Sequence, residues 1–297
     1  MDAHRRPSFV AALNLGTVLG LPEWSLGPRG DARVIAAAAI GAGYTAVQGG
    51  DDPAYAEAGL VTYGSGRVIA PDAARDVLAR QRDLGHRATT LHVGRGFETD
   101  AEALALLEAV LAASGQLGHT AYVETHRATV TQDMRRTLTW IERLPELRFN
   151  ADLSHWYTGL EMSYSDFEEK LDLLTPFFAR VGFIHGRIGN NCSMQVAVGN
   201  GGRDGPHVPR FAEMWTRCYQ GAAGAGQGGE PVVFAPELLP EVVDTPDGPL
   251  YIDYALTRQL PDGTVVETSD RWEQGLKLVD IARASHEAAS ARASLSL

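Results

Sequence analysis

Short apolar runs alternate along this chain with stretches whose apolar residues recur at helical spacing, and this alternation restricts the fold more than any other feature. Seven apolar runs predict β-strands, at residues 9–13, 44–48, 88–93, 120–124, 147–153, 181–185 and 231–235. Segments with helical spacing lie between these runs. One example begins at the capping-box pair Thr99 and Glu102 and continues with Leu104, Leu107 and Leu111 on one face. Such repeats predict parallel strands joined by crossover helices.

The strand count leaves two architectures open, a doubly wound open sheet and a closed (β/α)8 barrel. A barrel needs an eighth strand. The only candidate is the weak segment 60–63, within a stretch, 53–66, that otherwise reads as a loop. Segments 186–205 and 241–270 also read as long loops, because they are rich in Gly, Asn, Pro and Asp. No shift in composition marks a boundary, so we expect a single domain over residues 1–297.

Ligand-type side chains stand at the carboxyl ends of four successive predicted strands. They are Glu124, Asp152, His185 and Glu237. In a parallel barrel these ends surround one axis on one face, so the four side chains would converge. Three carboxylates in one cup raise one another's pKa or require a cation. With the imidazole they suit one divalent ion, Mn²⁺, Mg²⁺, Co²⁺ or Zn²⁺.

Each of these residues also has an ordinary structural interpretation. Glu124 and Glu237 are compatible with strand-end salt bridges, and Asp152 with a helix N-cap. His185 alone is compatible with a hydrogen-bonded core histidine. Only the joint pattern favours a functional site over these alternatives.

Four elements in order, Glu, Asp-x-x-His, His-x-Arg and Glu, give the chain a specific resemblance. They are Glu124, Asp152 with His155, His185 with Arg187, and Glu237. This order resembles the xylose-isomerase-like TIM-barrel superfamily, which includes sugar isomerases and epimerases, and the resemblance extends from about residue 9 to residue 284. It implies a (β/α)8 barrel, in which the count of seven clear strands leaves one strand irregular or missing.

The resemblance also implies roles for these residues. Glu124, Asp152, His185 and Glu237 would bind one divalent metal ion, and Glu124 and Glu237 would also act as the acid/base pair. His155 and Arg187 would hold substrate oxygens. Three departures from the pattern concern the substrate. Arg187 follows His185 by only two residues, closer than in the ketose 3-epimerases, and the segment after the third predicted strand is shorter than in those enzymes. The insertion at 186–205 introduces Gln195 and, beyond it, His207 as candidate pocket residues. The remaining candidate substrate contacts are His126 and Trp156, which follow strands.

The function expected from these residues is a metal-dependent sugar, keto-sugar or sugar-phosphate isomerase or epimerase that transfers a proton through an enediolate. The alternative is a lyase or dehydratase that acts on a keto-sugar, keto-inositol or keto-glycoside with the same site. A phosphodiesterase that cleaves DNA at abasic sites and a sugar-binding barrel without turnover are less favoured.

Charge and composition limit the classes of molecule that this protein is expected to bind. The net charge of −11 disfavours nucleic acid and anionic membrane surfaces. Two cysteines imply no disulfide framework, and neither a secretory leader nor a membrane-length apolar run is visible. We therefore expect a cytoplasmic protein with a small carbohydrate substrate. The resemblance implies self-association, since relatives commonly form dimers or tetramers.

Overall fold

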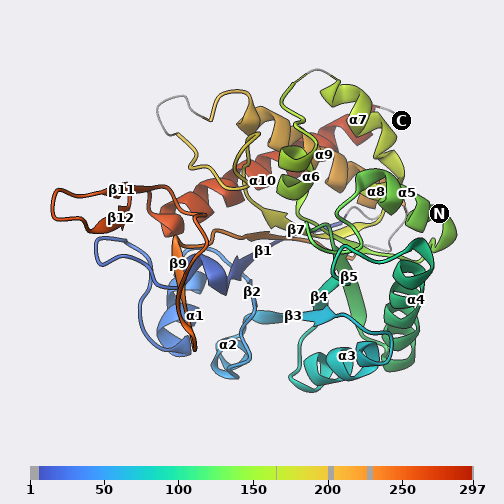
Figure 1. The fold of residues 1–297 in the computed structure, drawn as a ribbon, viewed down its shortest axis with the longest axis horizontal. Coiled ribbons are helices and arrows are strands. Elements are labelled where there is room, and N and C mark those ends of the chain that lie inside the picture. The colour runs from blue at the N-terminus through green and yellow to red at the C-terminus, as the bar shows by residue number, and fades with distance from the viewer. Residues whose placement is uncertain (1–6, 165, 200–203, 226–229, 296–297) are drawn as a thin grey trace.

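Eight parallel strands close into a barrel in the computed structural model of the chain (Figure 1). The structure describes residues 7–164, 166–199, 204–225 and 230–295. The barrel strands pair in chain order and β8 closes on β1. They are β1 (Phe9–Asn14), β2 (Ala46–Gln48), β3 (Val61–Val68), β4 (Ala88–Val93), β5 (Thr120–Glu124), β6 (Phe149–Ala151), β7 (Val181–Gly186) and β8 (Val232–Pro236). The predicted TIM barrel is confirmed, and the open sheet is excluded.

Helices cover the outside of the barrel. They are α1 (Ala32–Gly41), α2 (Ala54–Glu57), α3 (Ala73–Asp83), α4 (Asp100–Leu117), α5 (Met134–Arg143), α6 (Leu153–Gly159), α7 (Phe167–Leu173), α8 (Thr175–Phe178), α9 (His207–Gly224) and α10 (Arg271–Leu295), with a 3₁₀ turn η1 (Leu15–Val18). The predicted capping box of Thr99 and Glu102 begins α4. Ser165 and Glu168 have the same capping-box spacing, but Ser165 lies outside the described residues. No helix in the described parts of the chain is long and apolar enough to cross a membrane.

The eighth strand lies where the sequence suggested mostly loop. β3 covers Val61–Val68, so the weak candidate at 60–63 marks its start. Its middle residues, Gly64, Ser65 and Gly66, are not of the β-branched or aromatic types that favour strands. The structure shows why a glycine stands at residue 64, because a Cβ there would collide with the side-chain amide of Gln81 on α3. Close packing of α3 therefore conceals the strand from sequence patterns.

The inside of the barrel is divided along its axis. A buried layer of small and aromatic side chains fills its middle: Ala12, Ala46, Tyr63, Ala88, Tyr122, Phe183, Val233 and Ala235. Side chains alternate along a strand, so the next inward positions toward the carboxyl ends are two residues further on. On β1, β2, β3 and β4 these positions are polar, namely Asn14, Gln48, Ser65 and Thr90. The apolar layer therefore forms a floor beneath a polar cup.

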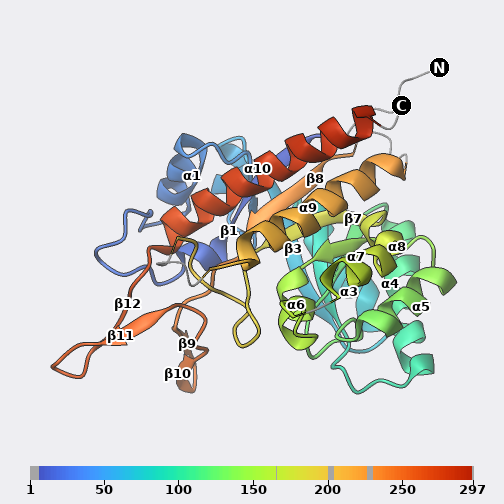
Figure 2. The ribbon, with the colours of Figure 1, turned by 90° about the horizontal axis from the view of Figure 1, so that it is seen from above.

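The segment between β8 and α10 contains two antiparallel hairpins where the sequence indicated a loop. They are β9 (Val242–Thr245) with β10 (Gly248–Tyr251), and β11 (Thr257–Gln259) with β12 (Val265–Glu267). Figure 2 shows them projecting from the barrel, while α9 and α10 lie together along it. The described part of segment 186–205 contains no helix or strand beyond the last residue of β7.

Candidate functional site

Four side chains from successive strand ends meet at the mouth of the barrel. Glu124 is the last residue of β5, and His185 is on β7. Asp152 directly follows β6, and Glu237 directly follows β8. One potential ligand atom from each residue lies within 4.8 Å of those of the others. The predicted convergence of these residues, called here the four-residue cluster, is therefore present in the fold.

Glu124 is buried among nitrogen donors. Its Oε1 lies 3.2 Å from Nε2 of His92, and its Oε2 accepts a 3.1 Å hydrogen bond from the amide of Asn150. Burial by itself opposes ionisation of Glu124. The imidazoles of His185 and His92 outweigh burial and hold the pKa of the Glu124 carboxyl well below its usual value. The carboxylate form is thus available as a ligand or as a base.

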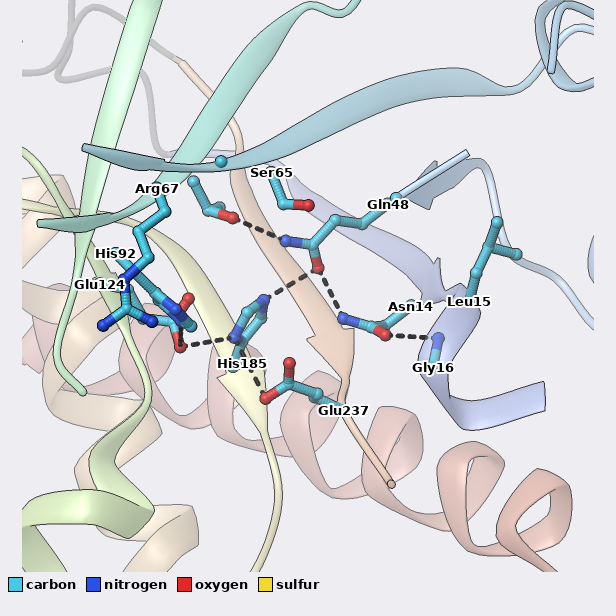
Figure 3. Close-up of a pocket in the computed structure, with 13 residues that line it drawn as sticks. Asn14, Leu15, Gly16, Gln48, Ser65, Arg67, His92, Glu124, His185 and Glu237 are labelled. Carbon is cyan, nitrogen blue, oxygen red and sulfur yellow. Dashed lines mark hydrogen bonds and ion pairs between the residues drawn. The ribbon is translucent and has the colours of Figure 1, made fainter. Parts of the chain in front are cut away.

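His185 presents one ring nitrogen to two carboxylates. Its Nε2 lies 2.9 Å from Oε1 of Gln48, whose amide nitrogen in turn donates to Thr90. Its Nδ1 lies 3.4 Å from a carboxylate oxygen of Glu124 and 3.4 Å from one of Glu237. Figure 3 shows His185 between these two acids.

This arrangement fits a bound divalent cation. When the His185 Nε2–H donates to Gln48, the lone pair of a neutral His185 Nδ1 faces two anions, which is unfavourable without a positive charge between them. The buried Nδ1 also has no hydrogen-bond partner among the described residues. Burial lowers the pKa of His185, but Glu237 and Glu124 raise it to about 9, so a proton satisfies the site when no metal does. One imidazole and three carboxylates form a donor set that suits several divalent metals.

Arg187 is buried beside the cluster. Its Nη2 contacts Oδ2 of Asp152 and lies 3.0 Å from Oε2 of Glu237, and its Nε donates to Ser154 at 3.0 Å. Its Nη1 has no partner among the described residues. Burial raises the pKa of Asp152, but Arg187 and His155 lower it well below its usual value. The guanidinium therefore balances charge among the carboxylates and keeps one donor free.

Asp152 is both a helix N-cap and a member of the four-residue cluster, two roles that the sequence analysis gave as alternatives. The Asp152 carboxylate accepts from the backbone N–H of Ser154, so it caps α6 as well as joining the cluster. His155 Nε2 lies 3.4 Å from the Asp152 carboxylate and 3.1 Å from Nη2 of Arg187. The capping and cluster roles are compatible, because the two Asp152 oxygens point to different partners.

Three imidazoles form a row along one wall of the site. The ring centroid of His126 lies 4.1 Å from that of His92 and 4.0 Å from that of His155. Burial and the neighbouring imidazoles lower the pKa of His126 to about 3. His126 thus lies beside the predicted cluster as a neutral ring, and His92, which the sequence analysis did not select, contacts Glu124 directly.

Two predicted substrate contacts lie elsewhere. Trp156 is buried in the hydrophobic core, with its indole N–H bonded to the carbonyl of Thr131 and its ring packed on Phe177. A sugar cannot reach the face of this ring without opening the core. The predicted stacking of Trp156 on a substrate is therefore replaced by a structural role in the core. Gln195 holds the backbone of Leu239 through both ends of its amide and lines a separate hollow.

His207, the other candidate pocket residue, also lies away from the cluster. It lies at the start of α9, where its Nδ1 is 2.8 Å from the hydroxyl of Tyr157.

A cavity of about 490 Å³ opens from the cluster toward β1, β2, β3 and β4. Its wall includes residues that sequence reasoning missed, namely Asn14, Gln48, Ser65, Arg67, Thr90 and His92. They occupy alternate positions at strand ends, which is the only sequence signal that could have found them. The volume is that of a small-molecule site.

Comparison with known proteins agrees with this architecture. No family model and no curated protein matches the chain. The structure of an L-ribulose 3-epimerase matches over 96% of this chain and 97% of that chain, with a TM-score of 0.56 and 17% sequence identity. A xylose isomerase-like TIM barrel protein from Mycobacterium smegmatis in complex with magnesium matches over 96% and 100%, with a TM-score of 0.52 and 10% identity. The chain therefore has the fold of the xylose-isomerase-like TIM barrels.

Proposed function

We propose that this protein is a divalent-metal-dependent isomerase or epimerase of sugars or sugar derivatives. The observation that carries the proposal is the convergence of Glu124, Asp152, His185 and Glu237 at the mouth of the barrel. The magnesium bound to the Mycobacterium smegmatis protein and the activity of the L-ribulose 3-epimerase support the same class.

Glu124, Asp152, His185 and Glu237 would hold the metal ion. When bound, a divalent ion polarises a carbonyl and acidifies the adjacent C–H bond. The acid/base work then falls to the two carboxylates that flank His185. Glu237 is the more accessible of them, with 18% of its side chain exposed against 3% for Glu124.

Two carboxylates on either side of one substrate carbon can remove a proton from one face and return it to the other. Return to the same carbon inverts its configuration, and delivery to the neighbouring carbon exchanges aldose and ketose. The guanidinium of Arg187, held beside Asp152 and Glu237, places a buried positive charge next to the cluster, which would offset negative charge that develops on an enediolate. His155 holds Arg187 and Asp152 in this arrangement.

The experiment that tests the proposal follows solvent deuterium into a panel of ketoses with Mg²⁺ or Mn²⁺ present. Glu124→Gln and Glu237→Gln should each abolish incorporation while the circular dichroism spectrum stays unchanged. Glu108→Gln, which changes an exposed acid on α4, is the matched control and should retain incorporation. Full exchange in either cluster variant, or equal exchange after chelation, contradicts the proposal. Product analysis then separates an isomerised from a dehydrated sugar, and a dehydrated product reassigns the enzyme to the lyases.

A further inference from the structure

Arg67 stands at the cavity wall because of the length and register of β3. Tyr63 of β3 belongs to the inner apolar layer, so alternation directs Ser65 and then Arg67 inward. β3 has eight residues and β4 has six, and Arg67 pairs in register with His92. Both residues line the cavity that also contains Glu124, His185 and Glu237 (Figure 3). The register therefore places a guanidinium in the same cavity as the four-residue cluster.

The guanidinium of Arg67 has weak partners. Its Nη2 reaches the carbonyl oxygens of Gly94 and Ala128, each at 3.4 Å. Within the described parts of the chain it forms no ion pair with a carboxylate. Arg187 differs, because it contacts both Asp152 and Glu237. Arg67 thus has a forked set of donors that is held near the cavity and largely free to bind an anion.

The charges of the site do not neutralise the positive charge of Arg67. Glu124, Asp152 and Glu237 contribute three negative charges. A divalent ion at the cluster, together with Arg187, would offset them. The rest of the cavity wall is polar without a further carboxylate, and it includes Asn14, Gln48, Ser65, Thr90 and the imidazole of His92. A cation that no described carboxylate offsets, at the wall of a partly enclosed cavity, favours an anionic ligand.

We propose that Arg67 is a specificity-determining residue that binds a terminal carboxylate or phosphate of the substrate. The substrate class is therefore an acidic sugar derivative, with its hydroxyketone at the four-residue cluster and its anionic end at Arg67. This inference rests on the proposed function, since it assumes that a sugar derivative occupies the cavity. The shared chemistry of the two anions is bidentate recognition by a guanidinium.

The test compares ketoses that differ only in their terminal group. Dihydroxyacetone, D-ribulose and D-fructose are paired with their terminal phosphates, and D-fructose is also paired with D-fructuronate, which carries a carboxylate at the same carbon. Dissociation constants are measured by calorimetry with Mn²⁺ and again after chelation. At least one anionic ketose should bind about tenfold or more tightly than its neutral partner, as expected for a charge-assisted bidentate contact. The phosphate and carboxylate arms show which anion the site takes.

Variants of Arg67 show whether this residue is responsible. Arg67→Ala should reduce the ratio of neutral to anionic dissociation constants to about one, and Arg67→Lys should retain part of it because the charge remains without the fork. Arg33→Ala removes an exposed arginine on α1 that pairs only at 3.7 Å with Glu57, and should keep the wild-type ratio. Similar thermal midpoints verify that the variants fold.

Three outcomes overturn the inference: equal binding of neutral and anionic ketoses, a ratio that survives Arg67→Ala, or no binding of any ketose by wild-type protein. These outcomes are distinct from failure of the proposed function, which is read from deuterium exchange and from binding of Mn²⁺ alone. A protein that binds Mn²⁺ and exchanges deuterium into neutral and anionic ketoses equally well retains the function and loses the inference.

Discussion

The side-chain amide oxygen of Gln48 lies 2.9 Å from Nε2 of His185, and this contact joins β2 to β7 across the barrel mouth. These strands are not neighbours in the barrel. Gln48 is itself fixed by Asn14 on β1 and by Thr90 on β4, at 2.9 Å each. The network orients the imidazole so that Nδ1 faces Glu124 and Glu237.

Gln48→Met should therefore weaken metal binding by about 10–100-fold, the usual effect of removing a group that orients a ligating histidine. The substitution preserves the length of the side chain but removes its three hydrogen bonds, to His185, Asn14 and Thr90. Calorimetric titration with Mn²⁺ measures the change in metal affinity. Gln132→Met, which alters an exposed glutamine, serves as the control. Unchanged affinity in Gln48→Met would show that His185 is oriented without this contact.

Gly186→Ala should damage both the fold and the site. A Cβ at Gly186 would collide with the ring of Phe234, which is fully buried. Overpacking of this kind costs about 1–3 kcal/mol of unfolding free energy. Relief of the clash must shift the flanking residues, His185 on β7 and Arg187 directly after it, so Mn²⁺ affinity should fall as well.

Urea denaturation and Mn²⁺ titration measure the two effects of Gly186→Ala. Gly115→Ala on α4 is the control, since a Cβ there meets no atom within 4 Å. It should leave metal affinity unchanged and stabilise the helix by up to about 1 kcal/mol. Wild-type stability in Gly186→Ala contradicts the prediction.

Arg271→Met should lower the free energy of unfolding by about 3–5 kcal/mol, as expected when one partner of a buried ion pair is removed. The buried guanidinium pairs with Glu267 at 2.9 Å and donates to the carbonyl oxygens of Thr17 at 2.7 Å and Leu19 at 2.6 Å. It thereby fixes η1, whose Gly16 lines the cavity.

Equilibrium denaturation checks the Arg271 prediction against Arg82→Met, whose exposed pair with Asp83 should be worth no more than about 0.5 kcal/mol. A loss of similar size in both variants would indicate that the contacts of Arg271 do not hold η1.

His119 should make the protein less stable in mild acid. Its Nε2 lies 2.8 Å from the hydroxyl of Thr89, and burial, followed by nearby His86 and Arg82, lowers its pKa. The unfolded chain therefore takes up a proton on His119 near its ordinary pKa of about 6.5 while the folded chain resists it. The contribution is present above about pH 6.5 and is lost as pH falls below that value.

Denaturation of wild type and His119→Gln between about pH 7.5 and pH 5 tests this contribution, because the amide cannot titrate in that range. The loss of stability on acidification should be smaller in the variant than in the wild type. Equal losses in the two proteins would assign the acid sensitivity to other groups.

The sequence by itself determined the strand–helix repeat and the chemistry of the strand ends. Glu124, Asp152, His185 and Glu237 could be selected because an acid or histidine directly after an apolar run is visible in one dimension. Closure of the barrel brings them together. The barrel and the convergence were therefore predictable, although the open sheet could be excluded only by the pairing of β8 with β1.

Tertiary structure alone decided the rest. It placed Trp156 in the core, paired Arg187 with two acids, and revealed β3, whose glycines and Arg67 do not form a strand-like pattern. Register between strands set His92 beside Arg67. The physical reason is that a strand's own residues determine which side chains alternate, whereas packing and hydrogen bonding between distant strands determine which of those side chains meet.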